Sequence, residues 1–410
     1  MSWNVVKLST VCNIDMGSAP KGSTYVELGE GVPLIAGAAD YGEVFPQPKK
    51  STLEPTKLCE KGDIILCVRA TIGDLNWADK TYCLGRGVAG LRAHDEKLDA
   101  KYLWYFIRSI ENELYLNSTG STFPQINKKV IESIQIPLPQ LETQKKIAAV
   151  LEKADQLRKD CQQMEQELNS LAQSVFIDMF GDPVTNPKGW KLASLSSLGV
   201  VNGGLQVTSK RSGNPISVPY LRVANVYRDF LKLDEVKNIL VTSRELERAM
   251  LEKGDILFVE GHGNANELGR AAVWNNEIKQ CVHQNHLIRF RPGAEIRPQY
   301  VSSFVNSEAG KRQLLSMSKT TSGLNTLSAS NISSLKVLAP PLQLQDKYLG
   351  VVAEILKQKN NNSLLASEFD AQFNVLMQKA FSGELKEGAN RPGNSSRLTQ
   401  SFHFFLFEPI

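Results

Sequence analysis

The sequence predicts an α+β protein in which two similar mixed α/β domains alternate with two long antiparallel coiled-coil helices, in a pseudo-two-fold arrangement. Three observations lead to this prediction. An apolar heptad repeat between residues 141 and 178 is typical of a coiled-coil helix. Four segments of the first half recur in the same order in the second half, which indicates an internal duplication. Short apolar runs within 64–68 and 255–259 are typical of buried strands.

The heptad repeat predicts one uninterrupted helix, because no Gly or Pro occurs between residue 141 and about residue 178. Its apolar residues recur in steps of three and four, and charged residues lie between them. At 1.5 Å per residue such a helix is about 55 Å long, and its narrow apolar seam needs a partner. The residues predicted to pair from this helix are Ile147, Val150, Ala154, Leu157, Met164, Leu168 and Leu171.

A second, weaker repeat near the C-terminus supplies the expected partner helix. The stretch 357–362 within it is polar, and Lys359 and Asn362 fall near the seam. We therefore expect tight pairing at the ends of the helices and looser pairing in the middle. The residues predicted to pair from this helix are Val351, Ile355, Leu365, Phe369 and Leu376.

The internal duplication is visible in four pairs of segments. Residues 60–68 recur as 252–259, at an offset of 192 residues, and both copies contain Glu-Lys-Gly-Asp-Ile. The offset rises along the chain, as expected for two copies with loop insertions of different length. The other matching positions are Trp3 with Trp190, Ile131 with Ile332, and Leu171 with Leu376.

Each copy is therefore expected to consist of a mixed domain followed by a long helix. The closing segments of the two mixed domains, 131–137 and 332–337, alternate in polarity and are predicted to be strands. Helices are predicted at 102–116 and 298–315. The predicted segments are a first mixed domain at 1–139, a long helix at 140–180, a second mixed domain at 181–339, a long helix at 340–387 and a disordered tail at 388–410.

Composition places the chain among ordinary globular proteins. It has 410 residues, 42% of them hydrophobic, and a net charge of +4, which is too mild to indicate nucleic-acid binding by itself. The six cysteines form no C-x-x-C pair, so we expect buried thiols in a reducing compartment. The N-terminus has no apolar signal core, and no apolar window is long enough for a membrane helix. We therefore expect a cytoplasmic protein.

The motifs that could carry catalysis are incomplete. Gly17 to Gly22 has the spacing of a phosphate-binding loop, but Ser23 occupies the position of the essential Lys. His283 and His286 form the closest histidine pair and lack a third metal ligand nearby in the sequence. Asp63 and Asp255 follow Gly at predicted turns, where a turn role is favoured over catalysis. We expect no catalytic residue, no metal and no cofactor, and hence no enzyme.

The polar loops of both mixed domains carry side chains that can read base edges. Arg and Lys suit guanine, Asn and Gln suit adenine, and Ser and Thr suit either. Any one of them could equally be a solvated loop residue, so the hypothesis depends on their occurrence in two similar domains. The candidates are Lys21, Ser23, Arg69, Thr71, Arg86, Ser121, Thr122, Gln125, Lys128, Lys210, Arg211, Arg222, Asn225, Asn264, Asn266, Lys319, Thr321, Asn325 and Asn331.

This layout resembles the specificity subunit of type I restriction-modification systems, over about residues 1–385. The resemblance rests on the starts of the two long helices, Pro139–Gln144 and Pro340–Gln345, and on the segments that end them, Phe180–Pro183 and Phe381–Leu385. The second start departs from the family pattern, because Gln343 and Leu344 stand where the family usually has Glu beside its Gln.

The resemblance implies that each mixed domain is a target recognition domain that reads one half of a split site in double-stranded DNA. The paired helices would set the spacing, and the chain would dock two modification subunits and, through them, the restriction subunits. Duplicated domains also mimic a two-fold dimer, whose half-sites lie about 34–36 Å apart. Two alternatives stay open: a self-contained nuclease or methyltransferase, and a coiled-coil adaptor that binds only protein.

Overall fold

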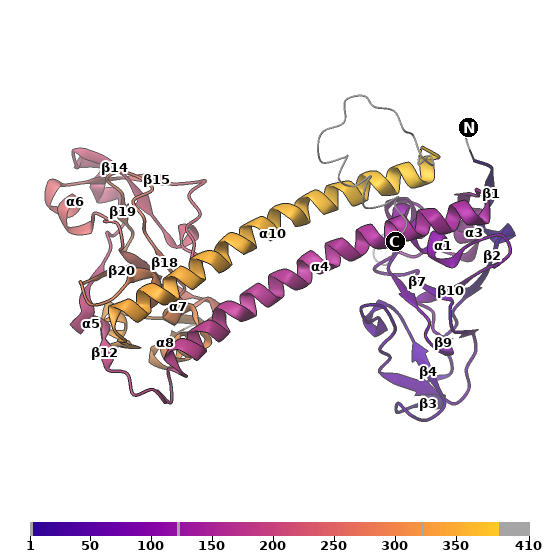
Figure 1. Cartoon of the computed structure of the whole chain (residues 1–410), viewed down its shortest axis with the longest axis horizontal. Helices are drawn as coiled ribbons and strands as arrows, with labels where there is room; N and C mark the ends of the chain where they lie inside the picture. Colours follow the sequence, from indigo (N-terminus) through magenta and orange to yellow (C-terminus); the bar gives the residue numbers. More distant parts are fainter. Residues whose placement is uncertain (1–2, 121–123, 322, 385–410) are drawn as a thin grey trace. The chain divides into compact units, whose positions relative to one another are not determined.

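The computed structural model describes residues 3–120, 124–321 and 323–384, and it forms two compact units (Figure 1). The first unit comprises Met1–Gln162 and Leu364–Ile410, and the second comprises Gln163–Ser363. The long helices α4 (Leu141–Phe180) and α10 (Leu342–Ser382) each contribute one half to each unit. The tail predicted at 388–410 lies outside the described residues, as do Ser121 and Thr122.

The first unit is built on two sheets. One is antiparallel with the strand order β2-β10-β7-β8, and the other has the order β3-β5-β4-β9-β6, with β4 and β9 parallel. A separate pair, β1 with β11, joins the two ends of the mixed domain. The strands are β1 (Val5–Lys7), β2 (Cys12–Met16), β3 (Tyr25–Val26), β4 (Val32–Ile35), β5 (Lys50–Thr52), β6 (Leu58–Cys59), β7 (Ile64–Cys67), β8 (Leu75–Trp77), β9 (Tyr82–Leu84), β10 (Val88–Ala93) and β11 (Gln135–Pro137).

The second unit repeats this plan. Its antiparallel sheet has the order β13-β20-β16-β18, the pair β12 with β23 corresponds to β1 with β11, and β14 pairs in parallel with β19 as β4 does with β9. The predicted duplication and the α+β fold class are therefore confirmed. The strands are β12 (Leu192–Ser194), β13 (Gly199–Gly203), β14 (Ile216–Leu221), β15 (Lys237–Val241), β16 (Ile256–Val259), β17 (Gly261–His262), β18 (Ala271–Val273), β19 (Val282–His283), β20 (Leu287–Pro292), β21 (Lys319–Thr321), β22 (Leu324–Thr326) and β23 (Lys336–Leu338).

The long helices pair in antiparallel fashion within each unit. In the first unit, Arg158 of α4 forms an ion pair with Asp370 of α10, and Ala148 and Met377 lie in one apolar core. In the second unit, Lys359 of α10 donates a hydrogen bond to Asn169 of α4 over 2.7 Å. Further along, the rings of Phe176 and Phe180 meet Tyr348 edge-on, with centroids 5.6 and 5.3 Å apart.

The residues predicted to form the helix seam differ in burial. Ile147, Ala154, Leu168 and Ile355 are buried, and Val150, Leu157, Phe369 and Leu376 are half-buried. Met164, Leu171, Val351 and Leu365 are 36–47% exposed, which corrects their prediction as seam residues. The buried stripe instead includes Leu151 and Phe373, because an α-helix of 3.6 residues per turn drifts away from a strict heptad.

The middle of the helices has a polar seam. Asn362 is buried at 9% exposure in the second unit, and Lys359 reaches Asn169 there. Leu364 and Leu365, which follow in the first unit, remain largely exposed. Both units thus confirm the expectation of apolar packing near the ends of the helices and looser packing toward their middle.

The predicted closing strands are largely wrong, because each segment begins as a short helix. Asn127 caps α3 (Lys128–Ser133) by accepting a hydrogen bond from the backbone of Val130, and β11 starts only at Gln135. In the second unit Ser328 caps α9 (Ala329–Ser334) in the same way, before β23. The alternation of Ile with polar residues suggested strands. The N-cap residues Asn127 and Ser328 show instead that a helix begins at the end of each preceding loop.

The predicted domain helices are each broken once. The first consists of α1 (Ala100–Ser109) and α2 (Glu111–Leu116), and the second of α7 (Pro298–Asn306) and α8 (Glu308–Met317). Ser307 caps α8 by accepting a hydrogen bond from the backbone of Gly310, which explains the break in the second unit. Two short helices remain in the second unit, α5 (Leu195–Leu198) and α6 (Ser243–Ala249).

One fully buried glutamine ties the start of each long helix to its own mixed domain. In the first unit, Gln144 accepts a hydrogen bond from the backbone of Asp99 and donates to the carbonyls of Lys97 and Pro139, each over 2.9 Å. In the second unit, Gln345 accepts from the backbone of Arg297 over 2.8 Å and donates to the carbonyl of Pro340 over 2.8 Å. This explains why Gln occurs in both segments that start a long helix.

The six cysteines are all buried thiols that form no disulfide bond, as predicted. Burial raises the pKa of the Cys12 and Cys281 thiols to about 12, so both thiols stay protonated at neutral pH. No helix within the described part of the chain is long and apolar enough to cross a membrane.

Candidate nucleic-acid interface

A buried aspartate starts the central strand of each unit. Asp63 accepts a hydrogen bond from the backbone N–H of Glu60 over 2.8 Å. It also accepts from Nε and Nη2 of Arg92, each over 2.8 Å. Asp255 repeats these contacts in the second unit, with the backbone of Glu252 at 2.8 Å and Arg291 at 2.7 and 2.8 Å. The prediction of a turn role for both aspartates is therefore confirmed.

At its other end, the central strand of each unit leads into polar loops. Matching backbone hydrogen bonds hold these loops in the two units. Val68 donates to the carbonyl of Gly87 over 2.9 Å, and Ile126 donates to the carbonyl of Val68 over 3.0 Å. In the second unit, Glu260 donates to His286 over 3.0 Å, and Leu327 donates to Glu260 over 2.7 Å. We call these segments the strand-end loops: 68–71 with 118–120 and 124–126 in the first unit, and 260–266 with 319–321 and 323–327 in the second.

The strand-end loops bring several predicted base-reading residues together. Gln125 forms backbone bridges with both Arg69 and Thr119 in the first unit. Thr71 lies in the same segment, with its hydroxyl 3.6 Å from the Cys67 thiol. In the second unit, Asn325 pairs in register with His262 on β17, so Gly261–His262 lies beside the hairpin β21–β22.

The hairpin β21–β22 was not predicted, because its sequence reads as a polar loop. Lys319 pairs in register with Thr326, and Thr321 pairs with Leu324. Asn264 caps a short turn and accepts a hydrogen bond from the backbone of Asn266 over 3.0 Å. Five of the predicted residues of the second domain (Asn264, Asn266, Lys319, Thr321 and Asn325) therefore lie in one loop cluster.

Other predicted residues lie on different elements. In the first unit, Lys21 precedes the short turn before β3 and Ser23 lies within it. Arg86 is exposed between β9 and β10. Lys128 starts α3 and lies 3.7 Å from Glu132. Asn331 belongs to the cap of α9, where it accepts a hydrogen bond from the backbone of Ser328 over 2.9 Å.

Three predicted residues of the second unit hold loops together, which corrects their interpretation as free base readers. Asn225 is 2% exposed, and its amide donates to the carbonyls of Lys232 and Glu235. Arg222 forms an ion pair with Glu235 over 2.8 Å. Arg211 pairs with Glu245 over 3.0 Å, whereas the neighbouring Lys210 is exposed.

Comparison with known proteins agrees with this duplicated architecture. A family model described as type I restriction modification DNA specificity domain matches residues 1–170. The putative type I restriction enzyme MjaX specificity subunit of Methanocaldococcus jannaschii is 40% identical over 169 residues, which cover 40% of each chain. The EcoKI specificity subunit of Escherichia coli K12 is 25% identical, over 93% of this chain and 89% of its own length. Residues 1–170 thus match a type I restriction modification DNA specificity domain, and most of the chain is similar to type I restriction enzyme specificity subunits.

Two solved structures show a similar fold. A type I restriction-modification S subunit from M. genitalium matches with a TM-score of 0.54 and 16% identity, covering 93% of this chain and 96% of that one. A chain from a study of complex assembly and conformational transition of the type I R-M system matches with a TM-score of 0.61 and 18% identity, covering 94% and 98%. The resemblance inferred from the helix starts and ends is thereby confirmed.

The two histidines of the pair His283 and His286 differ in burial: one lies in the core and the other at the surface. His283 is fully buried, with Nδ1 3.2 Å from the carbonyl oxygen of Ala249. His286 is largely exposed, and its Nδ1 lies 2.9 Å from Oε2 of Glu260. Across the described part of the chain, no group of three or more His, Cys, Asp or Glu side chains could hold a metal ion.

Burial of His283 predicts acid sensitivity. Burial, assisted by Arg289, lowers the pKa of His283 to about 4. Between this value and about 6.5 the unfolded chain binds a proton that the folded chain does not, so stability falls as the pH falls through that window. The free energy of unfolding should lose up to about 3 kcal/mol from this group by pH 4.

Denaturant unfolding at several pH values tests this expectation with His283→Asn, whose amide can still donate to Ala249. The variant should show a shallower pH dependence than the parent between pH 6.5 and 4. His94→Gln, which changes a half-buried histidine of the first unit, should keep the parental slope. Equal slopes for all three proteins would contradict the prediction.

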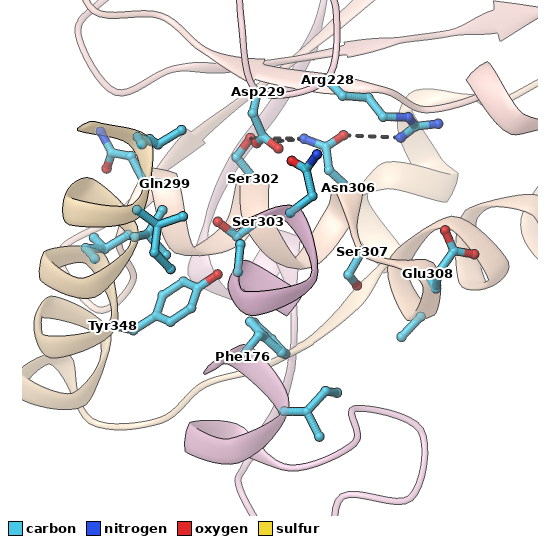
Figure 2. A pocket seen from close by; sticks show the side chains of 18 of the residues that line it. Phe176, Arg228, Asp229, Gln299, Ser302, Ser303, Asn306, Ser307, Glu308 and Tyr348 are labelled. Atoms are coloured by element: carbon cyan, nitrogen blue, oxygen red, sulfur yellow. Dashed lines mark hydrogen bonds between the residues drawn. The ribbon is translucent and has the colours of Figure 1, made fainter. Parts of the chain in front are cut away.

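A pocket of about 880 Å³ lies in the second unit between α4, α7, α8 and α10 (Figure 2). Figure 2 shows Asn306 between Arg228 and Asp229; it accepts a hydrogen bond from Arg228 over 3.3 Å and donates to Asp229 over 2.8 Å. Ser302 also donates to Asp229, over 2.7 Å. This network holds the loop before Phe230 against α7.

Two residues that line this pocket correspond to tryptophans in the first unit. Tyr102 and Tyr300 occupy matching buried positions, so Trp104 corresponds to Ser302. The strand pairing likewise matches Trp77 with Val273. The two tryptophan rings stack with their centroids 4.8 Å apart, whereas the second unit has the smaller side chains of Ser302 and Val273 at the lining of its pocket.

Proposed function

We propose that this chain is the non-catalytic DNA-specificity subunit of a type I restriction-modification complex. Domains 1–139 and 181–339 each read one half of a bipartite site in double-stranded DNA, and the segments 140–180 and 340–387 set the spacer. The observation that carries this proposal concerns the strand-end loops. The same backbone hydrogen bonds hold them in both units, while their side chains differ. Two similar readers with different side chains are what two unlike half-sites require.

The partners follow from the family. We propose that the paired helices dock two modification subunits, and that restriction subunits join through them. The net charge of +4 favours only modest DNA affinity for the isolated chain, because affinity grows with the number of phosphates that are neutralised. Because its substrate would be the host's own DNA, we place the protein in the cytoplasm.

The proposal is tested by co-expression with the neighbouring candidate methyltransferase and mapping of methylated positions in host DNA. Two short half-sites around a fixed spacer should appear. Exchange of residues 181–339 for those of a relative should then change one half-site only. Methylation by the purified chain alone would favour the enzyme alternative, and the absence of any split motif or complex would favour the protein-binding adaptor.

Shortening the two long helices should shorten the spacer and leave both half-sites unchanged. Residues 161–167 of α4 and 361–367 of α10 match in the register given by Arg158 with Asp370 and by Asn169 with Lys359. Removing both heptads takes away about 10 Å of helix, and a base pair spans about 3.4 Å, so we expect the spacer to lose about one to three base pairs. Methylation mapping reads this directly, and an unchanged spacer would refute the ruler role of the helices.

A further inference from the structure

The backbone hydrogen bonds that hold the strand-end loops are the same in the two units, but the side chains at two matching positions differ. Position 68 of the first unit corresponds to position 260 of the second, and position 87 corresponds to 286, because each pair forms the same backbone hydrogen bond. In the first unit these positions hold Val68, which is 1% exposed, and Gly87, where a Cβ would lie 2.2 Å from the carbonyl oxygen of Ala36. The first unit therefore has no room for a polar pair there.

In the second unit the matching positions hold two polar side chains, Glu260 and His286, that lie within hydrogen-bonding distance of each other and reach the surface. The Glu260 side chain is 32% exposed and that of His286 is 57% exposed. Nδ1 of His286 lies 2.9 Å from Oε2 of Glu260, and the amide of Asn285 lies 3.5 Å from Nε2 of the same ring. Among the described residues, no side chain or backbone group is hydrogen-bonded to the second carboxylate oxygen of Glu260. That oxygen is available as an acceptor.

The surroundings of Glu260 are the candidate base readers of the second domain. Its backbone carbonyl accepts from Leu327 at the end of the hairpin β21–β22, and β17 follows it directly. His262 on β17 pairs in register with Asn325 and accepts a hydrogen bond from the backbone of Asn264 over 3.0 Å. A carboxylate thus lies within a cluster of amide and imidazole side chains.

A carboxylate on a DNA-facing surface is repelled by the phosphates, so it is favourable only where a base donor faces it. In the major groove the N4 amino group of cytosine is such a donor, and Glu is a side chain suited to accept from it. We propose that Glu260 is a specificity-determining residue that accepts a hydrogen bond from a cytosine N4 amino group in the half-site read by the second domain. His286 is a positioning residue that fixes the carboxylate through Oε2.

This inference rests on the proposed function, and the same measurement separates the two. Methylated positions are mapped for the complete complex containing the parent chain, Glu260→Gln, His286→Ala or the control Glu247→Gln, which changes an exposed carboxylate on α6. The half-site of the second domain is identified beforehand by exchange of residues 181–339. A parent complex without a split motif would overturn the proposed function itself.

With a split motif in the parent, Glu260→Gln should reduce the preference for a C·G pair at one position of that half-site by about tenfold or more. The other half-site, the spacer and the yield of assembled complex should stay unchanged. His286→Ala should weaken the preference at the same position, and Glu247→Gln should change nothing. An unaltered motif with Glu260→Gln, or an equal loss at both half-sites, would show that Glu260 has only a structural role and would overturn the inference.

Discussion

Replacing Gln345 with alanine should destabilise the second unit by about 3 kcal/mol. The side chain is fully buried; its amide accepts from the backbone of Arg297 and donates to the carbonyls of Pro340 and, over 3.4 Å, Glu295. Each buried backbone group that loses its only partner costs about 1–3 kcal/mol. Gln144→Ala should have an equal effect on the first unit, where three backbone groups converge on the amide.

Hydrogen exchange of the complete chain resolves the two units and measures this effect. In Gln345→Ala, amides of α7 and of the first turns of α10 should exchange faster, while those of α1 keep their parental rates. Gln163→Ala provides the matched control, because its exposed amide bonds only to Glu167 on the same helix. Uniform exchange rates in parent and variant would show that the glutamine is dispensable.

Asp255→Ala should cost more than its counterpart Asp63→Ala. The Asp255 side chain is fully buried and faces two arginines, Arg291 at 2.7 Å and Arg289 at 3.9 Å. Burial lowers the pKa of Arg289 and the carboxylate of Asp255 raises it, so Asp255 offsets part of the cost of burying this guanidinium. Removing one partner of a buried ion pair costs about 3–5 kcal/mol, and we expect a value near 4 kcal/mol for Asp255.

Asp63 has one arginine partner, Arg92, whose side chain is 43% exposed. Water can solvate that guanidinium once the carboxylate is gone, so we expect a loss of about 2 kcal/mol for Asp63→Ala. Amide hydrogen-exchange rates in β7 and β16 report the stability of the two units and compare the two variants in one experiment. Asp234→Ala, which alters an exposed pair with Lys232, should leave both strands unchanged. Equal losses for Asp63 and Asp255 would contradict the role assigned to Arg289.

The sequence predicted the large features because periodicity and repetition are local properties of the chain. The seam spacing around Ile147 and Ala154 indicated a long helix, and the structure has α4 over Leu141–Phe180. The repeated Glu-Lys-Gly-Asp-Ile segment indicated two related domains, and both copies form the same turn, which leads through a buried aspartate into a buried strand. Capping was the weaker signal, since Asn127 and Ser328 start helices where alternating Ile residues indicated strands.

The candidate interface was predicted by residue type and only partly by position. Asn264 and Asn325 lie together in the strand-end loops, whereas Asn225 has the same chemistry and lies inside a loop. Glu260 and His286 were missed as a pair because they are 26 residues apart. Aligning the duplicated segments at their offset would have revealed that Val68 is replaced by a charged residue.

By itself the sequence determined the fold class, the duplication and the resemblance to specificity subunits, because each depends on residue order alone. The tertiary structure alone decided which polar side chains are free to meet a partner. Hydrogen bonds between distant residues make that choice: they bury Asn225 and His283 and bring Glu260 beside His286. The cost of leaving a buried polar group unpaired ensures that such partners are satisfied within the fold, and the remaining exposed groups are those available for recognition.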